Sequence, residues 1–177
     1  ARVLVEQIAQ RNGWSADELA DRTIPSAGFD EQGVLNLQYG ERLFTARLDG
    51  ALKLELRNPD DKVVKALPEP RKSDDPALIK EAKTQLSTSK KELKQVIELQ
   101  TQRLYEAMCA ERLWPAGEWR EYLQRHPVVT HLVQRLVWAE VAEDGALRLF
   151  RPTEDGSLND LDDDEGELDE TRRVRLA

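Results

Sequence analysis

The two histidines have the clearest capacity for chemistry in this sequence, because imidazole acts as an acid, a base or a metal ligand near neutral pH. His126 and His131 lie five residues apart with Pro127 between them, so they lack the i, i+4 spacing that places two ligands on one helix face. At a helix end, an imidazole can instead bind the last free carbonyl groups and complement the helix dipole. We therefore expect His126, Pro127 and Trp138 to form a joint between a helix and a hairpin, and we assign no catalytic residue.

The single cysteine, Cys109, is the next candidate, and it follows Met108 late in a predicted helix. A nucleophilic thiol needs an activating base, and the sequence offers none at a recognisable spacing. Free cysteines are usually buried, so we expect Cys109 in the core. A lone cysteine cannot form an internal disulfide, which fits a reducing compartment and a cytoplasmic location.

The net charge of −8 comes from one segment. Residues 152–171 contain ten Asp and Glu residues and no Lys or Arg, so the rest of the chain carries +2. With a charge so close to zero, the rest of the chain lacks the excess of positive charge that attracts nucleic-acid phosphates. We expect no direct nucleic-acid binding by this chain, and no membrane association because no long apolar run is present.

The acidic segment resembles a calcium-binding loop only in part. Asp160, Asp162 and Asp164 occupy the first, third and fifth positions of such a loop. Glu165 stands where the loop needs Gly, and Thr171 stands where it needs a bidentate Glu. The three aspartates are therefore weak metal candidates, and we expect a solvated, mobile loop because like charges at this density repel. No cofactor is expected.

Helix signals open the chain. Residues 2–11 have the composition of a helix end, and an Asn-Gly pair stops it. Ser15 and Glu18 have the spacing of a capping box, in which each side chain accepts a hydrogen bond from the backbone of the other. A short helix from there to about Arg22 is expected, and Pro25 ends it.

Alternating apolar residues from 34 to 67 predict four short strands. The breaks between the strands carry turn residues. Asp49-Gly50 favours a two-residue type I′ hairpin, which needs positive φ at both central positions. One face of the resulting antiparallel meander is apolar and must be covered.

A long helix follows the strands. Asp75 suits its N-cap and Pro76 its first position, and no helix breaker occurs before Pro115. At 1.5 Å per residue the helix would be roughly 57 Å long. Either it projects as an arm, or it breaks near residues 87–89, whose hydroxyl side chains compete for backbone hydrogen bonds. One shorter helix should begin at Pro115 and a second should span residues 128–138.

These signals predict an α+β fold with a four-stranded antiparallel meander, a long helix with two shorter helices, and a C-terminal hairpin turned at Asp144-Gly145. The expected division is a helical lead-in at 1–25, which ends an upstream region, an α+β module at 26–152, and an acidic loop with a truncated end at 153–177. Within the module the sheet occupies 34–67, the helices 75–137 and the hairpin 138–151. A last strand should start near Arg172.

Tryptophan and arginine residues are assigned to packing and to the surface. Each tryptophan adjoins a helix end or a strand start, which favours core packing over a ligand cage. The arginines late in the sequence alternate with glutamates, which favours ion pairs on helix surfaces over a phosphate-binding stripe. The tryptophans are Trp14, Trp114, Trp119 and Trp138; the arginines are Arg103, Arg112, Arg120, Arg125 and Arg135; the glutamates are Glu98, Glu106, Glu111, Glu118 and Glu121.

Three stretches together resemble one family. They are "LNLQYGERLFTARLDGALKLELRNPDDKVVKALPEP" followed by "SDDP", "RLYEAMCAERLWPAGEWREYLQRHPVVTHLVQRLVW" and "FRPTEDGSL". This run is similar to a domain of unknown function in large bacterial MolR-like proteins, named for a proposed molybdate metabolism regulator, which often carry a WGR domain. The resemblance covers roughly residues 15–160. It implies a cytoplasmic module of a multidomain, regulatory protein, and it transfers no catalytic residue.

The favoured function is a non-catalytic structural and interaction module of a larger bacterial regulatory protein. Its partners would be other domains of the same polypeptide or a separate protein, contacted through the long helix and the acidic segment. One alternative is a nucleic-acid-associated regulator that acts through an adjacent WGR-type domain. Another is an enzyme fragment, for which a pocket uniting His126, Glu121 and Arg135 would be the sign.

Overall fold

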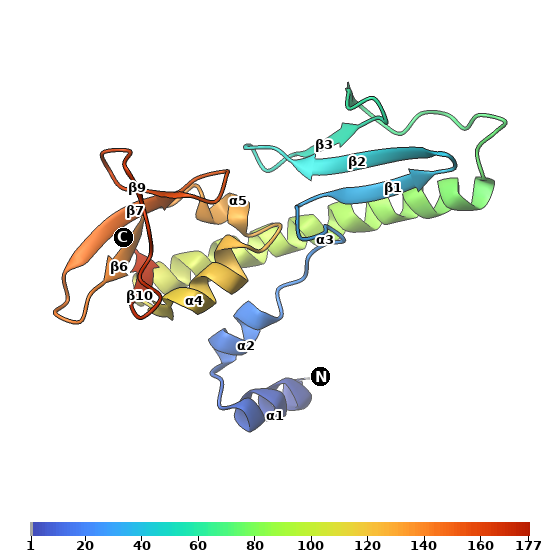
Figure 1. Ribbon diagram of the computed structural model, residues 1–177. Coiled ribbons are helices and arrows are strands. Elements are labelled where there is room, and N and C mark those ends of the chain that lie inside the picture. The colour runs from blue at the N-terminus through green and yellow to red at the C-terminus, as the bar shows by residue number, and fades with distance from the viewer. Residues whose placement is uncertain (1) are drawn as a thin grey trace.

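One long helix joins two antiparallel sheets in the computed structural model, which describes residues 2–177 (Figure 1). This helix, α3 (Pro76–Cys109), has 34 residues. It passes beneath the first sheet and continues to the second, so the predicted α+β class is confirmed. The helix is continuous through residues 87–89, and it neither breaks nor projects as an arm. Asp75 caps it as predicted, because its Oδ1 accepts the Ala77 N–H at 2.8 Å, and Pro76 is its first residue.

The first sheet is the predicted four-stranded meander. Its order is β1-β2-β3-β4, and it consists of β1 (Leu35–Tyr39), β2 (Arg42–Leu48), β3 (Leu54–Arg57) and β4 (Val63–Val64). Alternation in β1 buries Leu35, Leu37 and Tyr39 completely. These side chains share one core with Ile79 and Leu93 of α3, which cover the apolar face of the sheet.

The turn after β2 differs from the predicted type I′ hairpin. Asp49 Oδ1 accepts the N–H groups of Ala51 and Lys53 at 2.8 and 2.9 Å, and the positive φ falls on Leu52, at 62°. The Asp side chain thus stabilises a longer loop, as Asn and Asp often do in turns. We call this arrangement, in which Asp or Asn accepts from residues i+2 and i+4, an Asx loop. It recurs at Asp30, Asn58 and Asp160.

The second sheet contains the predicted hairpin and four further strands, in the order β5-β10-β6-β7-β8-β9. Its strands are β5 (Trp114–Pro115), β6 (Trp138–Val141), β7 (Leu147–Pro152), β8 (Leu158–Asn159), β9 (Glu165–Gly166) and β10 (Arg173–Leu176). The acidic segment was expected to be a loop, but it contributes β8 and β9. Leu158 and Leu168 are buried, and they anchor these turns to the sheet despite the surrounding charge.

The remaining helices are short. They are α1 (Arg2–Asn12), α2 (Ala16–Arg22), α4 (Ala116–Trp119), the π-helix η1 (Arg120–Gln124) and α5 (Thr130–Val133). The capping box of α2 is confirmed, with Ser15 Oγ 3.1 Å from the Glu18 nitrogen and Glu18 Oε2 2.6 Å from the Ser15 nitrogen. The predicted helix over 128–138 is too long. Tight turns flank α5, and Trp138 already belongs to β6.

Two hydrophobic cores lie along α3, one under each sheet. Ile24 and Ile97 pack against both cores. Val128 belongs to the core of the first sheet and its neighbour Val129 to the core of the second, and neither side chain is exposed. The chain therefore crosses from one core to the other at the residues that follow His126.

Cys109 is exposed, so the prediction that it lies in the core is wrong. Leu104 and Ala107 carry the buried stripe of α3 at this point. With 3.6 residues per turn, Cys109 lies about 200° around the helix from Ala107, on the opposite side.

Candidate functional site

A groove of about 770 Å³ lies between the two sheets, and the histidine joint forms one of its walls. Glu31 and Arg47 line it from the side of the first sheet. The other side is built by η1, the segment 125–127, α5 and the turn between β7 and β8. π-Helices often occur at functional sites, and this one brings Glu121 and Gln124 to the groove. This groove is the strongest candidate for a functional site.

His126 uses both ring nitrogens to hold the joint together. The backbone N–H groups of Val128 and Val129 each point at Nδ1 from 3.1 Å, so Nδ1 is the acceptor and Nε2 carries the proton. Nε2–H donates to the carbonyl of Ile24 at 3.1 Å. Burial lowers the pKa of His126, although the bond to Ile24 acts in the opposite direction. The neutral imidazole therefore ties the joint to the segment that leads out of α2.

This geometry changes the role predicted for His126. A cationic or hydrogen-bond-donating side chain bonded to the last carbonyls of the preceding helix was expected. The ring instead accepts hydrogen bonds from the start of the following segment, in the manner of an N-cap residue. His126 and Pro127 lie where the chain passes from one core to the other, and Trp138 lies further on, at the start of β6.

Replacing His126 with Ala is expected to lower the free energy of unfolding by about 1–2 kcal/mol, because two N–H groups lose their acceptor and one carbonyl loses its donor. His126→Asn should recover part of the loss, since Asn is a good N-cap acceptor. Urea unfolding followed by circular dichroism measures both values. An Ala variant as stable as the parent would contradict the bonding described here.

Stability should also fall as the pH drops below about 6.5. Burial lowers the pKa of both His126 and His131, so the unfolded chain binds protons that the folded chain does not. The stability is complete above the unfolded pKa near 6.5 and declines below it. Melting temperatures between pH 7.5 and 5.5 test this, and the decline should be smaller in His126→Asn. A flat profile in that window would contradict it.

His131 lines the same groove and is half-buried. Burial lowers its pKa, while the nearby Glu154 carboxylate opposes the shift. The residues whose convergence would indicate an enzyme site do not all meet. Glu121 and His126 both line the groove, whereas the guanidinium of Arg135 donates to the carbonyl of Gly50 at 2.8 Å.

Of the three aspartates proposed as weak metal candidates, Asp160 uses its side chain to hold a turn. Asp160 Oδ1 accepts the N–H groups of Asp162 and Asp164, at 2.9 and 3.0 Å, in an Asx loop. Asp162 and Asp164 take part in this turn through their backbone N–H groups. Across residues 2–177, no group of three or more His, Cys, Asp or Glu side chains is arranged to hold a metal ion.

A buried ionic cluster anchors α2 at the other side of the joint. Asp21 is 5% exposed, and its carboxylate accepts from Arg103 at 2.7 Å, Arg112 at 2.6 Å and Trp114 Nε1 at 2.9 Å. Two of the arginines expected in helix-surface pairs thus serve a buried carboxylate from another element. Arg120 likewise reaches Glu170, and Glu118 pairs with Arg22.

The sequence patterns did not indicate the burial of three carboxylates, of which the first is that of Asp21. The second is Glu140, which is 1% exposed and bonded to Arg148 and Arg172. The third is Asp74, which is 8% exposed and bonded to Arg42. A usable signal existed for Glu140 alone, because it stands between apolar residues in a predicted strand, where a charge has to be paired. Asp21 lies on a polar helix, where nothing in the local sequence indicates burial.

The fold and the groove define a two-sheet α+β module. In it, the ionisable side chains of His126, Asp21 and Glu140 bond to other elements and hold the structure together. Residues 62–177 match a family described as "Domain of unknown function (DUF4132)", and the chain belongs to this family. The whole chain is 28% identical, over 180 residues, to "Uncharacterized protein YehI" of Escherichia coli (strain K12). It spans 15% of that relative's length. No solved structure matches it. Within residues 2–177, no helix is long and apolar enough to cross a membrane.

Proposed function

We propose that this chain is a non-catalytic structural and interaction module of a larger bacterial regulatory protein located in the cytoplasm. The observation that carries the proposal is the use of His126. Its two nitrogens are both bonded to backbone groups, so this imidazole in the groove is committed to structure. The ion-paired carboxylates of Asp21 and Glu140 are committed in the same way.

The proposed partners are other domains of the same polypeptide. A relative that is several times longer and aligns with this chain from end to end supports this choice. The proposed contact surfaces are the exposed side of α3 and the acidic turns around β8 and β9. The resemblance to MolR-like proteins belongs to the same proposal, together with its implied WGR neighbour.

Cross-linking of the full-length E. coli relative, followed by mass spectrometry, tests the proposal. We expect cross-links between the 180-residue region that aligns with this chain and the remainder of that protein. An aligned region that cross-links only to itself would overturn the proposal.

Direct nucleic-acid recognition by this module is tested with the 177-residue chain itself. Fluorescence anisotropy with labelled duplex DNA and single-stranded RNA, at 50 and 200 mM salt, should show no binding at micromolar concentrations. Tight binding that weakens steeply with salt would favour direct nucleic-acid recognition instead.

A further inference from the structure

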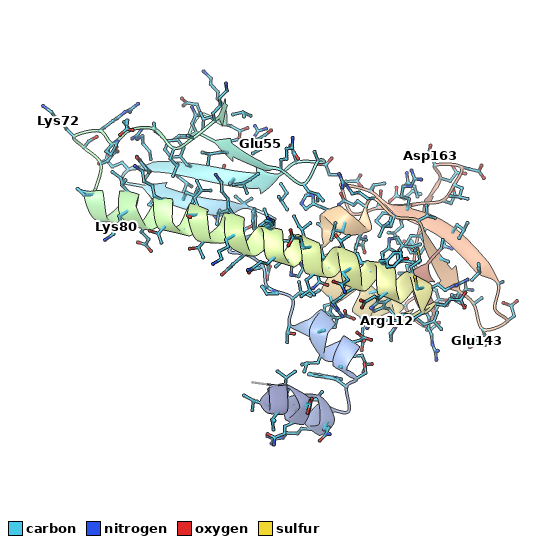
Figure 2. All side chains as sticks on the ribbon, turned by 180° about the vertical axis from the view of Figure 1, so that it is seen from behind. Glu55, Lys72, Lys80, Arg112, Glu143 and Asp163 are labelled. Atoms are coloured by element: carbon cyan, nitrogen blue, oxygen red, sulfur yellow. The ribbon has the colours of Figure 1, made fainter. Side chains whose placement is uncertain are left out.

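Helix α1 exposes a set of apolar side chains that no residue described by the structure covers. Val3, Leu4, Val5 and Ile8 are 66, 61, 50 and 41% exposed. Of the described α1 side chains, only that of Ala9 is buried. Both views show α1 standing away from α3 and the two sheets, beyond α2 (Figures 1 and 2). A helix of 11 residues that buries only one of its described side chains is only marginally stable in water.

The direction of α1 is nevertheless fixed by the turn that joins it to α2. Gly13, at a φ of +69°, donates to the carbonyl of Gln10 at 3.2 Å, and the Trp14 N–H donates to the carbonyl of Ala9 at 2.9 Å. These two bonds form a Schellman motif, which requires the left-handed conformation that Gly adopts without strain. Ser15 then caps α2 directly. The apolar residues of α1 are therefore held out from the body at a defined angle.

The base of this turn is tied to α4 and to the end of α3, which pack with the second sheet. The guanidinium of Arg22 lies 4.5 Å from the centre of the Trp14 ring and bonds to Glu118 at 2.7 Å. Asp21, one residue earlier, is held by Arg103 and Arg112. An exposed apolar helix on such an anchored base is preorganised for docking, which lowers the conformational cost of binding.

The area of the surface indicates what covers it. The four exposed side chains present an apolar surface on the order of a few hundred Å². A stable protein–protein interface buries ~800 Å² on each partner. A second copy of this chain, held by α1 alone, falls short of that area. Docking within one polypeptide needs less area, because the tether gives a high effective concentration. The relative's length leaves most of its polypeptide available for this contact.

We propose that α1 is a docking helix that inserts its apolar side chains into a groove on another domain of the same polypeptide. The partner surface would be an apolar groove that accepts one helix, with Leu4 and Ile8 as the i, i+4 anchors. The inference rests on the proposed function and names the surface and the partner for it.

The first test uses the 177-residue chain alone. We expect a monomer by light scattering at 10–100 μM, with α1 amides exchanging at least about 100-fold faster than α2 amides, since α1 lacks a partner. The double substitution Leu4→Glu and Ile8→Glu should leave the melting temperature unchanged, as should the control Gln7→Glu and Gln10→Glu on the same helix. A dimer that the first pair dissociates and the control pair does not would overturn the proposal.

The second test measures hydrogen exchange across the full-length E. coli relative. The segment aligned with α1 should be protected about as strongly as the segment aligned with α2. Rapid exchange there, at the rate of the isolated 177-residue chain, would overturn the docking helix. If other surface segments of the aligned region are protected while this one exchanges rapidly, the docking helix fails and the interaction module stands. If its whole surface exchanges freely, both fail.

Discussion

Replacing Asp21 with Asn is expected to lower the free energy of unfolding by about 3–5 kcal/mol. The carboxylate is 4% exposed and neutralises Arg103 and Arg112, whose side chains are only 16 and 18% exposed. Removing its charge leaves two guanidinium groups with little access to water and without their closest anion, and breaking a buried pair in this way is strongly destabilising. The amide also cannot accept as many hydrogen bonds, and Trp114 Nε1 competes for the single oxygen. Urea unfolding measures the loss.

Asp17 provides a matched control on the same helix. Its carboxylate lies 3.8 Å from Arg103 but is 67% exposed, so Asp17→Asn should cost less than about 0.5 kcal/mol. A loss at position 21 no larger than at position 17 would show that the guanidinium groups turn to solvent when the carboxylate is removed. Loss of this anchor should also free α2, together with the turn that holds α1.

Local signals predicted most of the elements. Asp75 and Pro76 at the start of α3, Ser15 and Glu18 at the start of α2, and the alternation in β1 each act within a few residues, and each is confirmed. At the turn after β2 the prediction failed, because a side chain formed hydrogen bonds that a two-residue hairpin does not include. Asp49-Gly50 suggested a two-residue turn, yet the Asp carboxylate accepts from two backbone N–H groups and produces a longer loop.

The acidic segment forms strands β8 and β9 and not the expected loop, because the spacing of its residues matters more than its total charge. Ten like charges suggest a chain that cannot pack, but Asp160 satisfies a tight turn and Leu158 and Leu168 supply the buried contacts. A search for Asp or Asn followed five residues later by a strand start would have found these turns. The candidate site depends on contacts across long sequence separations. His126 with Ile24, and Asp21 with Arg112, could not be inferred from any local pattern.

Replacing Trp138 with Ala is expected to cost about 3–5 kcal/mol, the range for removing a large aromatic side chain from a core. Trp138 is fully buried, and its ring meets Trp119 and Trp114 edge-on at centroid distances of 5.2 and 5.8 Å. Its Nε1–H donates to the carbonyl of Val133 at 3.0 Å, which closes the turn after α5. The loss therefore combines a cavity, aromatic contacts and a hydrogen bond at the place where the joint enters the sheet.

Trp138→Phe separates these contributions, because it keeps an aromatic ring and removes the N–H. We expect a loss of about 1–2 kcal/mol from the missing hydrogen bond and the smaller ring. Leu147→Ala on the adjacent strand β7 is the control; its side chain is 48% exposed, so its loss should stay below about 1 kcal/mol. Circular dichroism during urea unfolding gives all three values, and an Ala loss equal to that of the control would contradict a packed aromatic core.

The shape of the Trp138→Ala unfolding transition reports on the coupling between the two sheets and their cores. Ile24 and Ile97 pack against both cores, and α3 runs unbroken beneath both sheets. Unfolding the second sheet would strip the C-terminal half of α3 of its packing and uncover one side of both isoleucines. The first sheet should therefore unfold in the same step, giving one transition at a lower urea concentration with an unchanged slope. A separate early transition would mean that the joint at His126 connects two independently stable units.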